Sequence, residues 1–555
     1  MPVKRPVFLF LVLLLAAGVR LAGIRFGEPL AVHPHEDLLI TDAMEAGARK
    51  GHPGRFEYPS GMVYFTLAVQ GLHYLFSGAD SVRDFWMSYN SHPFEFHLWS
   101  RVATVFWALA GIWGIWLLGS EWDRGRTSMR FLGGAGAWLL AVHLLHIRES
   151  RFATVDVPLA TAMTFALWWL LREYHRPATT ILRLLPIALF IGICSGIHYP
   201  ALLLIFPMWY VGLAAALKEK ETSLSFSWMI GCAALQLVCA GAGFLLTTPY
   251  ALIDSGKLWS DIGFGMYSAF SEGGAIETGS SLGYLQGPWL WGGGIALGVF
   301  SFFGLMMAVL RHEEEDRVLL SFAVPFFIIL GLAAAVWGRW FLPLVPLQIL
   351  WAVRFIAVYA DHPWAVQWMA SGARRTGAWI ILFLIGLESL VPALRQAHLL
   401  RKTDSRVAAM GLLDSSVRPL DVVLTTPFCP PLPKTVQKRT ERGLLVDRAA
   451  FEKGLPYQPS IASLEDFREE GVNLILYSSF YWDAALDRSL IHRIPSLASY
   501  SAFLTDLKLQ AGQELEVLST SGDVPFHAED RFAPTFHLWS RRCPGPDVFL
   551  YRLRK

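Results

Sequence analysis

The sequence predicts a polytopic α-helical membrane protein with about eleven spanning helices, followed by a smaller α/β domain. Of its 555 residues, 54% are hydrophobic and only 17% are charged, where about a quarter is usual in soluble proteins. The mean hydropathy is +0.41, and a water-soluble globule could not hide so much apolar surface. The 47 Lys and Arg nearly balance the 45 Asp and Glu, which argues against a nucleic-acid-binding protein, because that class carries a basic excess.

Apolar runs of roughly 17 to 25 residues, with some shorter ones, predict the spanning helices. We expect them at Pro6–Ile24, Leu98–Gly119, Phe131–Ile147, Val157–Leu171, Leu184–Ile197, Ala201–Leu217, Phe226–Leu246, Trp289–Leu310, Val318–Val336, Leu342–Ala357 and Trp379–Pro392. A further apolar stretch, Gly61–Phe76, is interrupted by Gln70 and His73. We expect this stretch to form a helix in or near the membrane interface.

Lys and Arg in the short loops predict the orientation of the chain. With a cytoplasmic N-terminus, most of these residues fall in the inner loops, whereas the short outer loops hold Arg148, Arg151 and Arg339. Eleven spans then place the C-terminus outside, together with the long segments Arg25–His97 and Thr247–Pro288.

The hydropathy falls at about residue 395, which predicts two domains: a transmembrane domain of residues 1–394, with its outer loop 25–97, and an extracytoplasmic α/β domain of residues 395–555. Val, Leu, Ile, Tyr and Phe content predicts strands, and acids behind an N-capping Ser463 predict a helix. The expected elements are strands at Asp421–Thr426, Gly443–Asp447, Val472–Ser478 and Asp547–Leu553, and a helix at Ser463–Glu470. Cys429 and Cys543 fall in this domain, where an oxidising compartment would allow a disulfide between them. The sequence gives no distance between the two, so the bonded and the free state both stay open.

Two acids and two imidazoles follow the first span directly, in the run His33-Pro34-His35-Glu36-Asp37, before an expected helix at Leu38–Ala48. Carboxylates and imidazoles at a membrane edge can act as general bases or hold a cation. The alternative is that Asp37 caps the helix and the histidines are merely exposed.

A second polar cluster precedes the fourth span and includes Arg148, Arg151 and Asp156. An acid at the edge of a span indicates a functional role or a partner, because burying it unpaired is costly. The two guanidinium groups could bind an anionic phosphate. The alternatives are that Asp156 is a helix cap and that the arginines reach for lipid headgroups.

Two further basic groups lie beside predicted spans. His198 falls between two short apolar runs and is either a packing residue or a ligand. Arg339 precedes Trp340 and Leu342-Pro343, so it is either a phosphate contact or an ordinary anchor at the aromatic belt.

With these residues in hand, the chain resembles the polytopic C-type glycosyltransferases that use polyprenyl-phosphate sugars. This family includes the dolichyl-phosphate-mannose:protein mannosyltransferases and the bacterial lipid A aminoarabinose transferases. The segments that carry the resemblance follow the family's order: Arg20-Leu21, His33-Pro34-His35-Glu36, Asp42-Ala43-Met44, Glu57-Tyr58-Pro59-Ser60, Ser150–Leu159, Gly196–Leu202, Thr248–Leu252, Arg339–Pro343 and Pro544–Arg552. The coverage is nearly the whole chain, and the resemblance implies a bacterial inner-membrane protein.

The resemblance also implies site roles. The family's first outer loop bears an Asp-Glu pair whose Asp is taken as the catalytic base, and here His35 stands at the Asp position and Glu36 at the Glu position. Either Glu36 or Asp37 supplies the carboxylate, or His35 has replaced it, or activity is weakened.

The other family positions match more simply. The second acid matches Asp156, and the basic group after the fifth span, commonly Lys, is His198. Arg339 matches the family's Arg before Leu-Pro. The candidates for binding the donor phosphate are Arg148, Arg151, His198 and Arg339. Glu57, Tyr58 and Tyr250 mark the loops expected to meet donor or acceptor. No cofactor is required, although a divalent cation held by Glu36 and Asp156 is compatible with the family.

The function expected from this reading is inverting transfer of a sugar from a polyprenyl-phosphate donor to a hydroxyl of a protein, lipid or glycan acceptor. A carboxylate would take the hydroxyl proton, and positive groups would stabilise the leaving phosphate. The alternatives are a transporter of polyprenyl-linked substrates, which would place ionisable residues at mid-membrane, and a catalytically diverged scaffold of the cell envelope.

Overall fold

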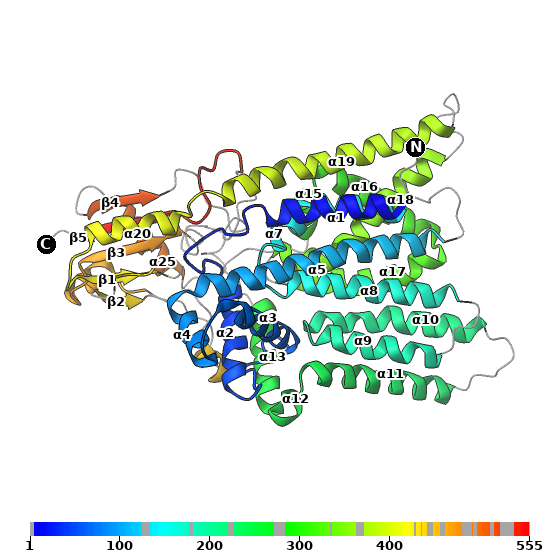
Figure 1. Cartoon of the computed structure of the whole chain (residues 1–555), viewed down its shortest axis with the longest axis horizontal. Coiled ribbons are helices and arrows are strands. Elements are labelled where there is room, and N and C mark those ends of the chain that lie inside the picture. The colour runs from blue at the N-terminus through cyan, green and yellow to red at the C-terminus, as the bar shows by residue number, and fades with distance from the viewer. Residues whose placement is uncertain are drawn as a thin grey trace.

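A bundle of long helices and a five-stranded sheet form opposite ends of the molecule (Figure 1). This computed structural model describes residues 5–124, 132–176, 181–218, 226–270, 283–333, 336–361, 371–426, 429–433, 436–440, 448–454, 461–479, 491, 497–510, 515–521 and 538–553. Helix α1 starts at the end of the bundle remote from the sheet, and the C-terminus lies beyond the sheet at the other end (Figure 1).

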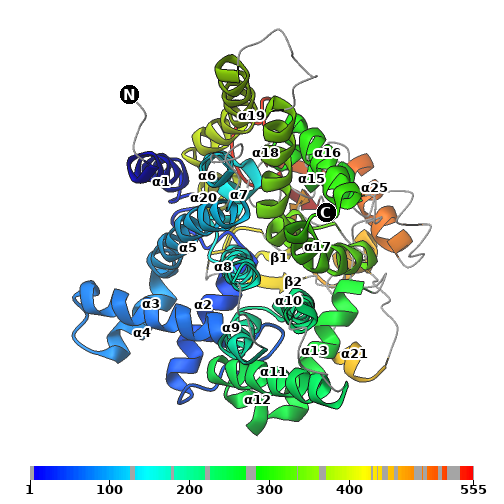
Figure 2. The same cartoon turned by 90° about the vertical axis from the view of Figure 1, so that its right-hand side faces the viewer.

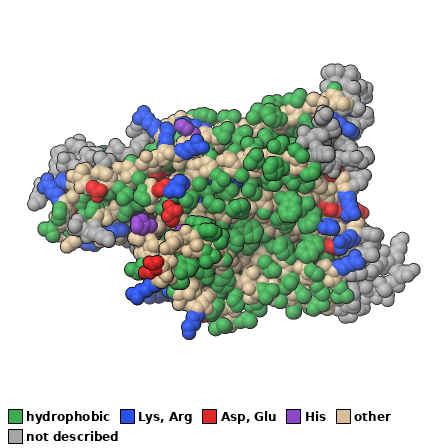
Figure 3. All heavy atoms as spheres, viewed as in Figure 1, with side chains coloured by type: hydrophobic (Ala, Val, Ile, Leu, Met, Phe, Trp, Pro, Cys, Tyr) green, Lys and Arg blue, Asp and Glu red, His purple; other side chains and the backbone are tan. Residues whose placement is uncertain are grey.

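The bundle is built from the apolar runs of the sequence. Its helices are α1 (Arg5–Leu21), α5 (Pro93–Trp122), α6 (Leu132–Val142), α7 (Leu144–Glu149), α8 (Asp156–Tyr174), η1 (Ile181–Leu184), α9 (Leu185–Ser195), η2 (Tyr199–Leu204), α10 (Ile205–Lys218), α11 (Phe226–Thr247), α15 (Pro288–Trp291), α16 (Ile295–Arg311), α17 (Glu314–Leu332), η3 (Gly338–Leu344), α18 (Val345–Asp361) and α19 (Ser371–Leu400). Hydrophobic side chains cover the visible flank of the bundle, and charged side chains gather at its two ends (Figure 3). An apolar belt with charged rims is the surface that a bilayer requires.

Five segments of the described chain are long and apolar enough to cross a membrane: Pro93–Trp122, Tyr199–Leu217, Met229–Thr247, Gly338–Ala360 and Gly372–Ser416. A sixth crossing results if Gly283–Trp291 and Ile295–Arg311, which meet at a bend of 117°, form one broken span. The protein is therefore a multi-pass membrane protein. Each of the eleven predicted runs contains helix, but α1, α6 and α9 are short, and the count of eleven stays a prediction.

One predicted span, Phe131–Ile147, is interrupted at His143, where α6 ends and α7 begins. The ring of His143 accepts a hydrogen bond from the amide of His146 and so caps α7 (3.4 Å). Arg20 of α1 donates to the last carbonyls of α6, those of Ala141 (2.7 Å) and Leu140 (3.1 Å). A buried guanidinium thus satisfies carbonyls that the break exposes, and its charge is favourable at the negative end of α6.

Short helices gather where the bundle faces the sheet (Figure 1). They are α2 (Pro34–Ala48), α3 (Gly61–Ser77), α4 (Val82–Ser91), α12 (Tyr250–Ile253) and α13 (Ser255–Phe270); the short helix α14 (Gly283–Gln286) directly precedes α15 in the chain. α3 and α4 extend to one side of the bundle in the view along it (Figure 2). The helix predicted at Gly61–Phe76 is confirmed as α3, and its position in the membrane interface stays a prediction.

Helix α2 begins earlier than the predicted Leu38 and has a different cap. The ring of His33 accepts a hydrogen bond from the amide of Glu36 (3.3 Å), so His33, and not Asp37, is the N-cap. Burial lowers the pKa of His33, which keeps the ring neutral and its lone pair available to accept. Pro34 in the first turn and the acids behind it favour a helix start here.

The sheet has the order β2-β1-β3-β5-β4. β1 runs parallel to β2 and β3, whereas β5 runs antiparallel to β3 and β4. The strands and the helices beside them are β1 (Val422–Thr425), β2 (Gln437–Thr440), β3 (Leu474–Ser478), β4 (Leu515–Ser521), β5 (Val548–Leu553), α20 (Ser405–Ser416), α21 (Arg448–Glu452), α22 (Leu464–Glu469) and α25 (Ala498–Gln510). We call these elements the C-terminal α/β region. Successive residues of β3 pack on opposite faces: Leu474 against α20, and Ile475 against α22 and α25.

Three predicted strands are confirmed as β1, β3 and β5, and the predicted helix Ser463–Glu470 is confirmed as α22. Ser463 caps it in a capping box with Asp466. The strand predicted at Gly443–Asp447 lies outside the described residues. β2 escaped prediction because its four residues, Gln437–Thr440, are polar and exposed.

The expected boundary at residue 394 lies within a helix, because α19 continues to Leu400. The two cysteines of the polar part are free thiols, so the disulfide between Cys429 and Cys543 is not formed. Instead, the thiol of Cys429 donates to the carbonyl of Leu476 (3.3 Å), which ties it to β3.

Candidate functional site

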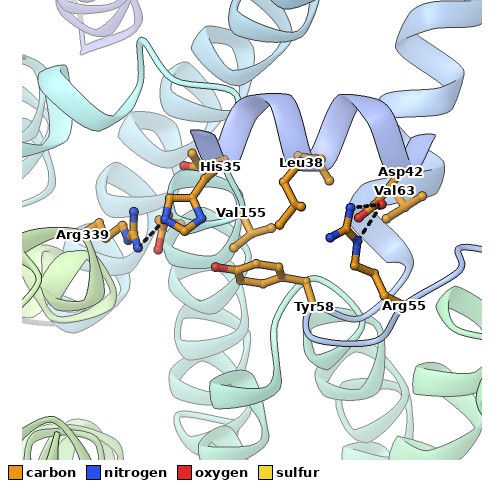
Figure 4. Close-up of a pocket in the computed structure, with 11 residues that line it drawn as sticks. His35, Leu38, Asp42, Arg55, Tyr58, Val63, Val155 and Arg339 are labelled. Carbon is orange, nitrogen blue, oxygen red and sulfur yellow. Dashed lines mark hydrogen bonds and ion pairs between the residues drawn. The ribbon is translucent and has the colours of Figure 1, made fainter. Parts of the chain in front are cut away.

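A pocket lies between α2 and the loop 55–58, at the end of the bundle that faces the sheet (Figure 4). It holds about 450 Å³ of empty space, a figure that includes space open to solvent. Its lining residues are His35, Leu38, Leu39, Asp42, Arg55, Tyr58, Val63, Thr154, Val155, Asp156 and Arg339. Segments far apart in the sequence thus meet here.

Helix α2 supplies one wall through residues at helical spacing. His35, Leu38, Leu39 and Asp42 follow the pattern i, i+3, i+4, i+7, which places them on one face. His35 and Asp42 lie at opposite ends of the pocket, with Leu38 between them (Figure 4). Asp42 was not among the residues singled out as a site, and this spacing from His35 is the signal that could have found it.

At one end of the pocket, Arg339 donates from Nη2 to Nε2 of His35 (3.1 Å). A guanidinium has no acceptor, so the imidazole accepts through its lone pair and is neutral in this arrangement. Arg339 is 9% exposed, and its guanidinium lies over the ring of Trp337 (4.9 Å to the centroid). A positive group is therefore held at the pocket wall by an imidazole and an indole, with its charge directed to the pocket.

Asp156 lies in the same part of the pocket, at the first residue of α8 and ahead of its apolar stretch. The carboxyl group is 6% exposed. Burial raises the pKa of Asp156 to about 6, although the charge of Arg339 opposes the shift. A carboxylate with a raised pKa is a better proton acceptor at neutral pH than an ordinary aspartate, because the group it forms holds its proton more tightly.

At the other end, Arg55 spans from the loop to α2 and pairs with Asp42 (Figure 4). Its Nε and Nη2 lie 2.8 and 2.7 Å from the same carboxylate oxygen, Oδ1. Burial raises the pKa of Asp42 to about 6, against the effect of Arg55. Tyr58 forms the floor between the two ends, and burial raises the pKa of its phenol as well. The site therefore offers two polar ends separated by an aromatic and aliphatic middle.

Glu36 does not line the pocket. Its carboxylate accepts hydrogen bonds from α5 and from the segment before α8 instead. Arg101 of α5 donates to its two oxygens, from Nε at 2.9 Å and from Nη2 at 2.8 Å. The amide of Ala153 donates to Oε1 as well (2.8 Å). Both charged side chains are fully buried, so Glu36 joins α2 to α5 and to the segment before α8.

Arg101 is a residue that sequence reasoning missed. It also donates to the carbonyls of Ile24 and Phe26, each at 2.9 Å, and its guanidinium lies 3.9 Å from the ring centroid of Phe26. An Arg inside the predicted span Leu98–Gly119 is itself a signal, because a charge there requires a partner.

The remaining candidates of the first cluster and of the basic set lie outside the pocket lining. Asp37 has a side chain 57% exposed, near the ring of His97 (3.8 Å). Arg148 pairs with the adjacent Glu149 (2.6 Å). Arg151 is fully buried and donates to Gln396 and to the carbonyl of Val19, each at 2.9 Å.

His198 stands just behind the floor of the pocket. Its ring meets the ring of Tyr58 edge-on, with 5.1 Å between centroids, and its Nδ1 accepts from the amide of Tyr199 (3.1 Å). In the neutral ring the proton is then on Nε2.

The other two loop candidates bind protein groups. Glu57 accepts from Arg448 (3.0 Å), and the hydroxyl of Tyr250 donates to the carbonyl of Lys50 (2.8 Å). Of the three residues expected in these loops, the structure brings Tyr58 into the pocket.

Each carboxylate expected to hold a cation lies near an arginine. Glu36 accepts three hydrogen bonds, two from Arg101 and one from the amide of Ala153, and Asp156 lies near the positive charge of Arg339. Within the described part of the chain, no three His, Cys, Asp or Glu side chains gather as metal ligands would.

The sequence matches no protein-family model and no curated protein, but solved structures are similar to it. An oligosaccharyltransferase from Archaeoglobus fulgidus, tethered to an acceptor peptide with the NVT sequon, has a TM-score of 0.51 at 12% identity over 89% of this chain and 72% of that one. ArnT from Cupriavidus metallidurans bound to undecaprenyl phosphate has a TM-score of 0.46 at 14% identity over 99% of this chain and 98% of that one. ArnT is a lipid A aminoarabinose transferase, one of the groups that the sequence resembles. The likeness to the oligosaccharyltransferase, at 12% identity, shows a shared fold.

Proposed function

We propose that this protein is an inverting glycosyltransferase that moves a sugar from a polyprenyl-phosphate donor to an acceptor hydroxyl at the outer face of the membrane. The observation that carries the proposal is one pocket, at one end of an apolar bundle, that holds a buried carboxylate, Asp156, near a buried guanidinium, Arg339. This is the pair of charges that the reaction needs. The shared fold with an oligosaccharyltransferase supports it.

Asp156 is the proposed general base. As the acceptor oxygen attacks the anomeric carbon, its proton passes to the carboxylate, and the bond from that carbon to the phosphate oxygen breaks with its electron pair on the oxygen. Glu36 is the weaker candidate because its oxygens already accept hydrogen bonds from Arg101 and Ala153. Asp37 is weaker because it is exposed and does not line the pocket.

Arg339 is the proposed partner of the leaving phosphate, whose negative charge grows as the bond breaks. His35 orients it through the 3.1 Å hydrogen bond. His35, at the position where the family carries its acid, is thereby a positioning residue, since its lone pair at Nε2 is already occupied by Arg339. The carboxylate of the reaction comes from α8 and no longer from α2.

The Asp42–Arg55 end of the pocket supports a polar group of the sugar. A carboxylate accepts from hydroxyl groups and a guanidinium donates to them, and Tyr58 offers a ring face between the two ends. The proposed lipid carrier is a polyprenyl phosphate, which suits a site at the end of a membrane-spanning bundle; undecaprenyl phosphate, to which ArnT from Cupriavidus metallidurans is bound in its structure, is the form used in the test.

The test is transfer of labelled sugar from a panel of polyprenyl-phosphate donors by the purified full-length chain in detergent or nanodiscs. Wild type, Asp156→Asn, Arg339→Gln and Asp37→Asn are compared, the last as a matched control that removes an exposed acid outside the pocket. We expect wild type and Asp37→Asn to transfer and Asp156→Asn not to.

Undecaprenyl phosphate binding by the same four proteins separates the alternatives. If wild type binds it and no donor supports transfer, the diverged scaffold replaces the enzyme as the best reading; Glu36 bound to Arg101 is the observation that favours that second candidate. If Asp156→Asn transfers as fast as wild type, the assignment of the base is wrong.

A further inference from the structure

We propose that Arg448 of the C-terminal α/β region is a positioning residue for the pocket: through Asp261 and Glu57 it holds the segment 55–60 that carries Tyr58. This inference deepens the proposed function, and the effect that it predicts on sugar transfer rests on that function. The effect that it predicts on the segment 55–60 does not, because that effect concerns only how the segment is held.

The first step is the docking of α21 on α13, which lie side by side (Figure 2). Arg448 of α21 forms an ion pair with Asp261 of α13 and donates to Glu57 at 3.0 Å. Phe451, on the next turn of α21, packs against Phe264 (5.4 Å between centroids) and Tyr267 (5.1 Å). A charged contact and an aromatic contact thus fix α21 to the same face of α13.

The second step runs from Asp261 to the pocket. Its side chain is fully buried, and while Oδ1 meets Arg448, Oδ2 accepts from the amide of Phe56 (2.6 Å). The carbonyl of Phe56 accepts from the hydroxyl of Tyr199 (2.6 Å). The backbone of Phe56 is therefore held on both sides, two residues before Tyr58 enters the pocket.

Arg448 is the source of compensation for that buried carboxylate. A fully buried acid needs opposite charge as well as hydrogen-bond donors, and besides Arg448 the side chain of Lys257 lies 3.8 Å from Asp261. Without Arg448, Asp261 keeps a weaker and more distant partner. The fold can then persist while the hydrogen bond from the amide of Phe56 to Asp261 weakens, which makes the role of Arg448 testable.

A second arginine of the same region reaches the opposite wall. Arg406 of α20, held by Asp404 at 2.8 and 2.9 Å, donates to the carbonyl of Val32 (2.9 Å). Val32 precedes His33, the N-cap of α2. The C-terminal α/β region thus contacts two of the segments that enclose the pocket: Arg406 contacts the residue before α2, and Arg448 contacts the loop that carries Tyr58.

The experiment uses the full-length chain with Arg448→Gln, Arg448→Lys and, as a matched control, Arg439→Gln. Arg439 belongs to the same region and forms an exposed ion pair with Glu470, so its loss removes the same charge at a surface site on β2. Hydrogen–deuterium exchange of peptides that cover residues 55–60 is the first readout, because the amide of Phe56 donates to Asp261.

We expect exchange at Phe56 to become about tenfold faster in Arg448→Gln, since a charge-assisted contact is lost. Arg448→Lys, which keeps the charge, restores most of the protection, and Arg439→Gln exchanges as wild type does. In the transfer assay, Arg448→Gln lowers kcat/KM about tenfold while Arg439→Gln does not.

Two outcomes would overturn the inference: protection at Phe56 that is the same in Arg448→Gln as in wild type, or equal losses in Arg448→Gln and Arg439→Gln. If exchange responds as expected but wild type transfers no sugar, the positioning role stands and the proposed function fails. If wild type transfers sugar and Arg448→Gln changes neither exchange nor kinetics, the positioning role fails alone.

Discussion

Glu36 and Arg101 form a fully buried, two-pronged ion pair across 65 residues of sequence, with donor–acceptor distances of 2.9 and 2.8 Å. The pair removes the most suggestive acid of the first outer loop from the pocket. It also fixes the rotation of α2, and so directs His35 and Asp42 toward the pocket on the neighbouring face.

Glu36→Gln is expected to lower the free energy of unfolding by about 3 kcal/mol, because it leaves the guanidinium of Arg101 buried without its charge partner. Thermal unfolding of the purified protein in one detergent measures the effect. Asp37→Asn is the control: the adjacent acid is exposed, and its loss changes stability by less than about 0.5 kcal/mol. Equal melting temperatures for the two variants would contradict this account of Glu36.

Asp156→Asn is expected to reduce kcat by about a hundredfold or more, since it removes the proton acceptor and keeps the shape of the side chain. Donor binding is expected to change far less, so kcat falls while KM stays close to that of wild type. A variant that loses binding and turnover together would indicate that Asp156 holds the donor instead.

The pH dependence of wild type follows from the same residue. Its pKa is raised to about 6 by burial, and the base works as the carboxylate, so kcat is full above that pH and falls as the pH drops through about 6. Rates measured at several pH values on both sides of 6 check this. An unchanged rate down to the ordinary range of aspartate, about pH 4, would exclude Asp156 as the base.

Arg339→Gln is expected to weaken binding of undecaprenyl phosphate by about tenfold to a hundredfold, the usual effect of losing a hydrogen bond to a charged group. Arg339→Lys keeps the charge but loses the planar guanidinium, so its affinity for undecaprenyl phosphate is expected to lie between those of wild type and Arg339→Gln. The matched control is Arg55→Gln, which removes the arginine at the other end of the pocket and is expected to leave phosphate binding nearly unchanged. If Arg55→Gln weakened phosphate binding more than Arg339→Gln does, the phosphate would bind at the Asp42 end of the pocket.

Cys429 and Cys543 are expected to react with iodoacetamide when the protein is unfolded without a reductant, because the two thiols are not joined in a disulfide. In the native protein, burial raises the pKa of Cys429 to about 12, so its thiol stays protonated and alkylates slowly. Mass spectrometry of the labelled peptides distinguishes the two states. A peptide linked through Cys429 and Cys543 would contradict the structure.

Much of the helical architecture could be predicted, since apolar runs mark helices wherever a chain must satisfy its backbone in lipid. Breaks inside those runs could not. His143 lies at the break between α6 and α7, where Arg20 of another helix donates to the last carbonyls of α6. Contacts of this kind are set in three dimensions and leave only a weak trace in local sequence.

The site shows the same division. The sequence could indicate Asp156, Tyr58 and Arg339 as residues of interest, and the structure brings these three to one pocket. It could not separate Glu36 from His35, because adjacent residues on a helix differ by about 100° in direction, and the start of α2 decides which of them faces the pocket. Arg55 escaped notice because its partner, Asp42, lies on a different element.

Helix α19 also has a length that matters. Its 30 residues extend for about 45 Å at 1.5 Å per residue, whereas the hydrocarbon layer is about 30 Å thick. If it stands near the bilayer normal, roughly 15 Å of its length lies outside the hydrocarbon layer, shared between its two ends, and the end nearer the sheet leads into α20. The pocket lies at the end of the bundle that faces the sheet, so under the proposed function the reactive hydroxyl of an acceptor must come close to the lipid headgroups, as one on a lipid anchor or a flexible peptide can.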